Sequence, residues 1–250
     1  MTDSINIRGV NINNVNLTEA TQICENYINS DSFHCVFTPN SEIIQLCVEK
    51  PEYLPLINSA DLITPDGIGV IYASKILGTP LKCKTAGYDL GLEVVNLSNN
   101  SGYKIFFLGG KPGIAEAARD KLLKKYPNAV FVGCHDGYFD KSDCEENSKV
   151  IDEINAAAPD ILYVCFGVPA QEKWISENRG RLKTVKLCLA LGGSLDGYSG
   201  NVKRAPEIFI KLGLEWFYRL CKEPKRIGRM MKLPKFLIGT IVYKFLKNKF

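Results

Sequence analysis

The chain has 250 residues, of which 46% are hydrophobic, and a formal net charge of +4 at pH 7. This length fits one α/β domain with an appendage or two small domains, and the hydrophobic content argues against extensive disorder. No stretch of about 18 apolar residues is present, which argues against a membrane-spanning helix, and the N-terminal residues lack the pattern of a signal peptide.

The charge is distributed unevenly along the chain. Residues 204–250 contain twelve Lys or Arg and three Asp or Glu, a net charge of +9. Residues 1–203 contain nineteen and twenty-four, a net charge of −5. We therefore predict a core over residues 1–203 and a basic appendage over residues 204–250. Such asymmetry indicates a polyanionic partner, either a membrane surface or a nucleic acid.

The cysteines and histidines favour a cytoplasmic protein without a metal centre. The nine cysteines are spaced singly, and Cys35, Cys165 and Cys188 lie within apolar runs. A free thiol packs there as a small hydrophobic group, and the odd number fits a reducing compartment rather than a disulfide framework. The two histidines, His34 and His135, lack the spacing of zinc ligands.

Strands and helices are expected to alternate along the core. Apolar runs typical of buried strands cover residues 33–38, 60–66, 104–108, 129–133, 161–166 and 185–191. Helical patterns cover residues 41–50, with Ser41 as a possible cap, and residues 67–77, 89–99, 114–126 and 142–157. Near-continuous apolar strands separated by helices predict a parallel sheet covered on both faces, a Rossmann-like α/β fold.

The C-terminal residues have a different pattern. One amphipathic helix is expected over residues 204–222. Beyond it the chain is both basic and apolar, which is typical of a segment that lies in a membrane interface. Pro234 and Gly239 argue against one long helix there.

Polar or glycine-rich segments follow five of the predicted strands. Because ligands bind at the carboxyl ends of the strands in such sheets, we expect these segments to gather at one edge. They are Thr38-Pro39-Asn40, Asp66-Gly67, Gly109-Gly110, Gly167–Glu172 and the Gly-rich loop Gly192-Gly193-Ser194-Leu195-Asp196-Gly197.

Each segment has both a chemical and a structural interpretation. The Asp66 carboxylate could accept a proton from an attacking hydroxyl, or cap the following helix. Thr38 and Asn40 could bind hydroxyls, or form a cap and a turn. The N–H groups of Gly109 and Gly110 suit a diphosphate, but a glycine pair also makes a tight turn without a ligand.

The last two segments, Gly167–Glu172 and Gly192–Gly197, also have both a structural and a chemical interpretation. Glu172 follows Gln171 at the start of a predicted helix, where a carboxylate complements the helix dipole. In the Gly192–Gly197 loop, turn formation competes with recognition of a ribose or a base by Asp196.

A parallel sheet with polar strand ends and a basic C-terminal segment is compatible with several function classes. Two of them are a nicotinamide-dependent oxidoreductase and a nucleic-acid-binding protein without enzymatic activity. The strict G-x-G-x-x-G fingerprint is absent, which counts against a nicotinamide-dependent oxidoreductase on the same plan. A nucleic-acid binder would use the basic C-terminal residues but would leave the polar strand ends without a task. No D-x-D pair is present to hold a divalent ion, so Lys, Arg and backbone dipoles are expected to neutralise a leaving diphosphate.

The chain resembles the WecG/TagA/CpsF family of bacterial glycosyltransferases from about Ile5 to Lys232. The matching segments are Phe37-Thr-Pro-Asn40, Ala60-Asp-Leu-Ile-Thr-Pro-Asp-Gly-Ile-Gly69, Thr85-Ala-Gly-Tyr-Asp89, Phe107-Leu-Gly-Gly110, Gly167-Val-Pro-Ala-Gln-Glu-Lys-Trp174, Gly192-Gly-Ser-Leu-Asp196 and Val202-Lys-Arg-Ala-Pro206.

The resemblance implies an inverting transfer from a UDP-sugar without a metal or other cofactor. The implied donor is UDP-N-acetylmannosamine or its uronate, and the implied acceptor is N-acetylglucosamine linked to undecaprenyl diphosphate. The implied place is the cytoplasmic face of the cell membrane, with an anionic membrane surface as a partner. Self-association is possible, and no nucleic acid is expected.

The resemblance also implies roles for individual residues. Asp66 corresponds to the catalytic base, Thr38 and Asn40 to neighbouring pocket residues, and Gln171 to the family's glutamine. Lys84 stands where relatives usually have arginine; it keeps the charge but loses the bidentate fork. With Arg219, Arg226 and Arg229 of the appendage, Lys84 is expected to offset charge on the leaving diphosphate. UDP is expected at Gly109, Gly110, Gly192, Gly193 and Asp196.

Overall fold

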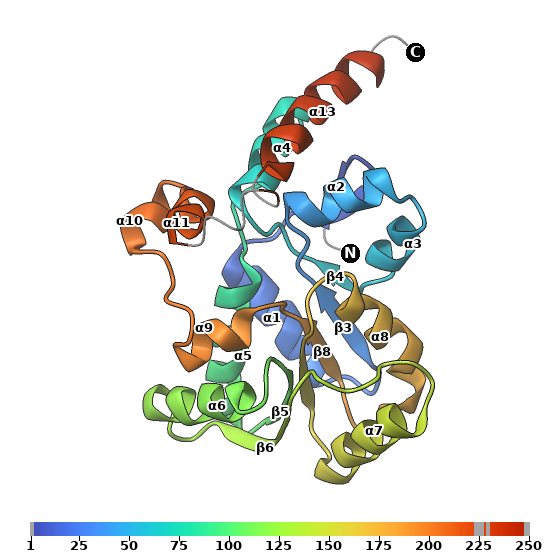
Figure 1. Ribbon diagram of the computed structural model, residues 1–250, viewed down its shortest axis with the longest axis vertical. Coiled ribbons are helices and arrows are strands. Elements are labelled where there is room, and N and C mark those ends of the chain that lie inside the picture. The colour runs from blue at the N-terminus through green and yellow to red at the C-terminus, as the bar shows by residue number, and fades with distance from the viewer. Residues whose placement is uncertain (1–2, 223–227, 229–230, 248–250) are drawn as a thin grey trace.

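The computed structural model describes residues 3–222, 228 and 231–247, which are built around a six-stranded sheet (Figure 1). All six strands are parallel. In spatial order they are β4 (Leu62–Ile63), β3 (His34–Phe37), β8 (Leu187–Ala190), β7 (Ile161–Cys165), β5 (Lys104–Gly109) and β6 (Val130–His135). The predicted Rossmann-like α/β fold is confirmed.

Helices cover both faces of the sheet. One face carries α1 (Leu17–Ile28), α5 (Gly87–Ser101), α6 (Ile114–Lys125) and α9 (Ser194–Ser199). The other face carries α2 (Ser41–Glu49), α3 (Tyr53–Asn58), α4 (Ile68–Leu77), α7 (Glu145–Ala157) and α8 (Ala170–Asn178). Alternate strand residues point to opposite faces, so Phe106 of β5 packs in one core and Phe107 in the other.

The N-terminal residues form elements that the strand and helix patterns did not predict. β1 (Ser4–Ile7) pairs antiparallel with β2 (Val10–Asn13). α1 begins with a capping box, in which Asn16 Oδ1 accepts from Glu19 N at 2.8 Å and the Glu19 carboxylate accepts from Asn16 N at 2.9 Å. The N-x-x-E spacing is the sequence signal for this start.

Two helix starts at the carboxyl edge of the sheet differ from the expectation. Asn40 caps α2, because its Oδ1 accepts from Glu42 N at 2.9 Å and Ile43 N at 3.2 Å, so the prediction that Ser41 is the cap is wrong. α4 begins after Gly67, which adopts φ of +83° and is the N-cap. Asp66 is therefore not the N-cap residue of α4.

The helices after the core also differ from the prediction. Residues 204–222 form two short helices, α10 (Glu207–Lys211) and α11 (Glu215–Lys222), rather than one. The chain turns between them at Gly213, where φ is +71°. The Gly-rich loop expected around Asp196 is largely helical, since α9 begins at Ser194.

α13 (Lys232–Lys247) is one continuous helix, contrary to the expectation from Pro234 and Gly239. Pro234 lies in the first turn of α13. Backbone N–H groups of the first turn make no hydrogen bond within the helix, so a proline without an N–H is tolerated there. Gly239 faces Arg8, and a Cβ on this glycine would lie 2.8 Å from Arg8 Nη1. Glycine is therefore suited to position 239 because a larger side chain would not fit against Arg8.

α13 packs along α4 and α2 and continues beyond the body of the molecule (Figure 1). Phe236 and Thr240 are fully buried in this contact. Lys235 Nζ lies 2.6 Å from Glu49, and Lys232 Nζ lies 3.4 Å from Glu42. None of the described helices is long and apolar enough to cross a bilayer. The boundary at residue 204 stays a prediction.

Candidate active site

A cavity of about 220 Å³ lies where β3 and β4 end, and we call it the β3–β4 pocket. Its wall comes from the two strand ends, the loop before α5, the residue at the start of the appendage, and α11 and α13. Among the lining residues are Asn40, Asp66, Lys84, Tyr88, Arg204, Glu215, Trp216 and Leu233. The predicted core and appendage thus both contribute to it.

Backbone hydrogen bonds bring the loop of Lys84 beside the strand end of Asp66. Thr85 N–H donates to Pro65 O at 2.9 Å, and the buried Thr85 hydroxyl donates to Val15 O at 2.8 Å. Thr64 N–H donates to Phe37 O at 3.0 Å, which continues the β3–β4 pairing to the edge. Asp66 and Lys84 therefore belong to one small region.

Of the residues predicted to act chemically, Asp66, Asn40 and Lys84 line this pocket. Thr38 is not among the lining residues. Its hydroxyl donates to Ala190 O at 3.3 Å, and a Cβ on Gly87 would lie only 2.7 Å from Thr38 Oγ1. Thr38 thus joins β3 to β8 and to the start of α5.

Both cations among the described residues of the pocket wall face carboxylates. Lys84 Nζ lies 3.5 Å from Glu215 Oε2, and each side chain is 20% exposed. Arg204 makes a bidentate contact with Asp89, with N–O distances of 2.6 and 2.7 Å, and its guanidinium lies 4.5 Å from the centre of the Tyr88 ring. The bidentate pair is the stronger of the two contacts.

Sequence reasoning predicted no functional role for Arg204, Asp89 or Tyr88, although each lies in a segment that carried the family resemblance. Asp89 and Arg204 have opposite charges but lie in two separate motifs, so the sequence indicates their ion pair only weakly. Glu215 and Trp216 carried no comparable signal, because α11 was expected as part of a longer amphipathic helix. Their approach to the pocket depends on the turn at Gly213.

Gly109 and Gly110 do not line the β3–β4 pocket. Gly110 N–H donates to Cys165 O at 3.2 Å, and Gly110 O accepts from Gly137 N at 2.8 Å. A Cβ on Gly109, whose φ is +134°, would lie 2.5 Å from Cys165 O. The pair therefore permits close packing between strand-end loops, and the Gly110 N–H that was expected to hold a diphosphate is already bonded within the protein.

Gln171 also has a structural task in the present arrangement. It is 2% exposed, and its Oε1 accepts from Gly192 N at 2.9 Å and from Gly167 N at 3.3 Å. Its amide nitrogen donates to Glu172 Oε1 at 2.9 Å. Gln171 thus ties the loop after β7 to the loop after β8, which contains Gly193, the N-cap of α9.

Glu172 is a buried carboxyl in the first turn of α8 and is 1% exposed. Burial raises its pKa from 4.5 to about 7, against the hydrogen bond from Gln171, which lowers it. Its Oε2 has no hydrogen-bond partner within the described part of the chain. The predicted role of Glu172 was to complement the helix dipole with a negative charge. Because the carboxyl is neutral below about pH 7, this role alone does not explain the residue.

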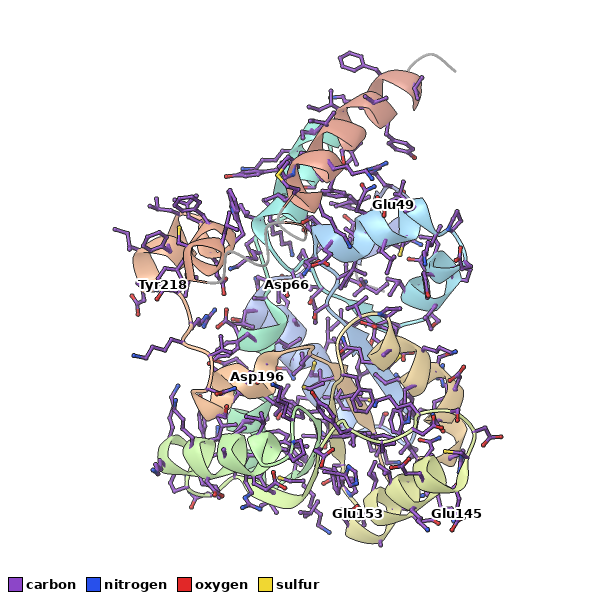
Figure 2. All side chains as sticks on the ribbon, in the orientation of Figure 1. Glu49, Asp66, Glu145, Glu153, Asp196 and Tyr218 are labelled. Atoms are coloured by element: carbon purple, nitrogen blue, oxygen red, sulfur yellow. The ribbon has the colours of Figure 1, made fainter. Side chains whose placement is uncertain are left out.

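Asp196 lies on α9 and is partly exposed. Its Oδ1 accepts from Asn201 Nδ2 at 3.3 Å. Figure 2 shows it apart from Asp66 in that view, and it is not among the residues that line the β3–β4 pocket. The backbone of Arg219 lies in α11, but its side chain is not described, and Arg226 and Arg229 lie outside the described residues.

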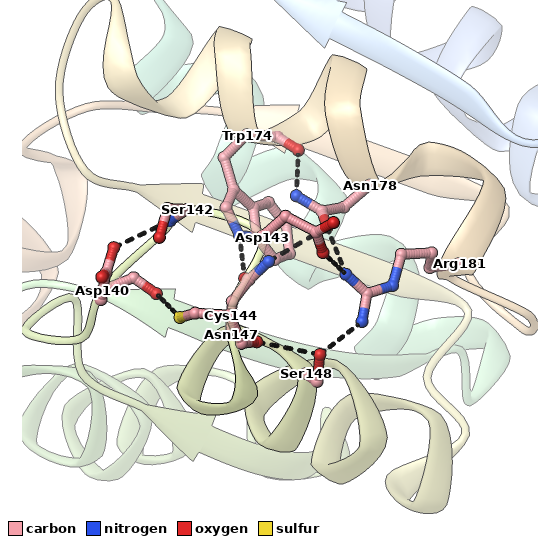
Figure 3. Close-up of polar contacts among 9 residues, drawn as sticks. All are labelled: Asp140, Ser142, Asp143, Cys144, Asn147, Ser148, Trp174, Asn178 and Arg181. Carbon is pink, nitrogen blue, oxygen red and sulfur yellow. Dashed lines mark hydrogen bonds and ion pairs between the residues drawn. The ribbon is translucent and has the colours of Figure 1, made fainter.

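A second cavity, of about 720 Å³, lies between α8 and the loop before α7. Its buried polar groups bond to one another: Trp174 Nε1 donates to Asn147 Oδ1 at 2.7 Å, and Asn178 Nδ2 donates to Trp174 O at 2.8 Å (Figure 3). Arg181 Nη2 donates to Ser148 Oγ at 2.8 Å. This network holds α7 to α8, and none of the predicted site residues that the structure describes lines the cavity.

No group of three or more His, Cys, Asp or Glu side chains within the described ranges is arranged to hold a metal ion. The β3–β4 pocket brings acidic and basic groups together. They combine a strand-end carboxylate, a nearby ammonium group and an aromatic ring.

The sequence profile of the Glycosyl transferase WecG/TagA/CpsF family matches residues 5–250. The chain belongs to this family. It is therefore an enzyme of the glycosyltransferase class, in agreement with the resemblance seen in its motifs.

Relatives over nearly the full length share one name, N-acetylglucosaminyldiphosphoundecaprenol N-acetyl-beta-D-mannosaminyltransferase. The Bacillus subtilis (strain 168) protein is 36% identical over 237 residues, which are 94% of this chain and 90% of the relative. The Staphylococcus aureus (strain MRSA252) protein is 35% identical over 250 residues, 99% of this chain and 94% of the relative. The Bacillus spizizenii protein is 35% identical over 218 residues, 87% and 82% of the two chains.

Proposed function

We propose that the protein transfers N-acetylmannosamine from its UDP derivative to N-acetylglucosamine linked to undecaprenyl diphosphate, with inversion and without a metal ion. The acceptor and the transferred sugar follow from the name that the relatives share. The observation that carries the proposal is Asp66, which lines a pocket at the carboxyl edge of the sheet together with Lys84.

The proposed reaction is one in-line displacement. Asp66 accepts the proton of the acceptor hydroxyl while the hydroxyl oxygen bonds to the anomeric carbon. The bond from that carbon to the diphosphate oxygen breaks, and its electron pair leaves with UDP. Positive groups that meet the leaving diphosphate stabilise the transition state by about 3–4 kcal/mol each. We assign this task to the appendage arginines Arg219, Arg226 and Arg229, and contacts to the nucleoside to Asp196.

UDP release tests the proposal directly. With UDP-N-acetylmannosamine and a soluble analogue of the lipid-diphosphate acceptor, we expect UDP to be released at the same rate with and without EDTA. Donor without acceptor is the control and releases little UDP. If EDTA stops the reaction, the metal-independent mechanism is wrong; if only another UDP-sugar reacts, the donor assignment is wrong.

We also propose that α13 binds an anionic membrane surface. Ile238, Val242 and Phe245 are 63%, 52% and 66% exposed and are spaced to share one face of the helix, while Phe236 and Thr240 are buried in the protein. Fully burying one large apolar side chain contributes about 1.5–3 kcal/mol, and each nearby Lys or Arg adds about 1 kcal/mol at an anionic surface.

Replacing both Ile238 and Phe245 by Ser should weaken binding to phosphatidylglycerol vesicles by at least about tenfold, measured by co-sedimentation. UDP release with the soluble acceptor should be unchanged, because neither side chain lines the pocket. Tyr138→Ser is the control, since Tyr138 is 67% exposed on a loop of the core. Equal vesicle binding by the double variant and wild type would rule out this face of α13.

A further inference from the structure

The β3–β4 pocket has a charged side and an apolar side. Lys84 contributes an ammonium group, and Trp216 and Leu233 contribute apolar surface from α11 and α13. A Cβ on Gly69 would lie 2.4 Å from Leu233 Cδ1, so the glycine allows Leu233 to pack at this position. A ligand that fits both sides carries negative charge next to hydrocarbon.

The size of the pocket limits what it holds. Sites that enclose a whole small-molecule ligand usually measure about 300–1,000 Å³. The β3–β4 pocket measures about 220 Å³ and therefore holds part of one substrate rather than both substrates. Asp196, the residue assigned to the nucleoside, is not part of its wall.

The stereochemistry of the transfer indicates which substrate, the donor or the acceptor, the β3–β4 pocket binds. In an inverting displacement the base and the leaving group lie on opposite faces of the anomeric carbon. Lys84 lines the same small pocket as Asp66, and the bond from Thr85 N to Pro65 O holds their chain segments together. If Asp66 is the base, the acceptor hydroxyl enters this pocket, which favours Lys84 as a contact of the acceptor rather than of the departing UDP that the family resemblance implied.

We propose that the β3–β4 pocket binds the diphosphate and the first part of the isoprenoid chain of the lipid-linked acceptor. This inference rests on the proposed function and names the part of the substrate that the pocket takes. Lys84 binds the acceptor diphosphate in exchange for Glu215, because the Lys84–Glu215 contact of 3.5 Å is longer and weaker than the bidentate contact between Arg204 and Asp89.

Trp216 and Leu233 contact the isoprenoid. Leu233 belongs to the first turn of α13, the helix that exposes Ile238, Val242 and Phe245 further along. The hydrocarbon chain therefore leaves the pocket beside the helix that we assign to the membrane. One helix then serves both to bind the bilayer and to admit the lipid.

Farnesyl diphosphate is a suitable probe, because it joins a diphosphate to a short isoprenoid. The chain has two tryptophans, of which Trp174 is 1% exposed in the core and Trp216 lines the pocket. We expect farnesyl diphosphate to change the tryptophan fluorescence of the full-length protein in a saturable way. Trp216→Phe should remove this change.

Two substitutions separate the charged and the apolar contacts. Lys84→Gln should weaken the binding of both farnesyl diphosphate and inorganic diphosphate by about tenfold. Leu233→Ser should weaken the binding of farnesyl diphosphate by about tenfold and leave inorganic diphosphate within about twofold. Tyr138→Ser, at an exposed position of the core outside the pocket, is the control and should change neither. UDP binding, measured by calorimetry, should stay within about twofold in all three variants.

The outcomes separate this inference from the proposed function. Equal binding of farnesyl diphosphate by wild type and both variants, or competition between UDP and farnesyl diphosphate, would overturn the acceptor pocket. A loss of inorganic diphosphate binding in Leu233→Ser would overturn the apolar contact. If UDP release is normal but farnesyl diphosphate does not bind, only the acceptor pocket is rejected. If farnesyl diphosphate binds selectively but no UDP is released, the proposed function is rejected and the acceptor pocket is retained.

Discussion

Asp66→Asn is expected to lower the rate of UDP release by about 10²–10⁴-fold, the usual contribution of a general base. The amide keeps the shape of the carboxylate but does not take the proton of the acceptor hydroxyl. Gly67, not Asp66, is the N-cap residue of α4, and asparagine keeps a side-chain oxygen that accepts hydrogen bonds. The free energy of unfolding should therefore stay within about 0.5–1 kcal/mol of wild type.

Steady-state kinetics and urea unfolding together test this expectation. Asp152→Asn is the matched control, because Asp152 is exposed on α7 and lies outside the pocket; it should change neither quantity. A near-normal rate in Asp66→Asn would remove Asp66 from the role of base. A large loss of stability would show instead that the carboxylate holds the fold together.

Glu172→Gln is expected to flatten the dependence of stability on pH. In the folded protein burial raises the pKa of Glu172 from 4.5 to about 7. Between these values the folded state holds a proton that the unfolded chain has released, so the free energy of unfolding falls as pH rises from about 4.5 to 7 and stays lower above that. The shift of about 2.5 pH units corresponds to at most about 3 kcal/mol.

Urea unfolding between pH 4.5 and 8 measures this effect. Glutamine does not ionise, so the decrease in Glu172→Gln should be smaller than in wild type by up to about 3 kcal/mol. Glu52→Gln, at an exposed position, should follow the wild-type curve. Identical slopes in Glu172→Gln and wild type would contradict the buried, proton-binding carboxyl.

The alternation of apolar strands and helices was enough to predict the parallel sheet and the gathering of polar segments at one edge. It was not enough to predict which segments share a cavity, because that depends on strand order. β3 and β4 are neighbours, so Asn40 and Asp66 meet in one pocket. β5 lies three strands from β3, so Gly110 does not reach it. Strand order arises from long-range packing rather than from any local pattern.

Local rules failed where tertiary contacts or backbone geometry decided the result. Asn and Ser are equally common helix caps, and Asn40 rather than Ser41 caps α2 because Asn40 has the extended backbone that precedes a helix. The apolar face expected over residues 204–222 is interrupted by the turn at Gly213. Pro234 did not break α13, since it lies in the first turn.

The distribution of the thiols has a practical consequence for following the appendage. Eight of the nine cysteines are buried or partly covered, and burial raises the pKa of Cys24 and Cys165 to about 12. Cys221 is exposed and lies on α11, the helix that also carries Trp216. Maleimide chemistry at neutral pH should thus favour Cys221, which gives a natural attachment point for a fluorophore or spin label without engineering the chain.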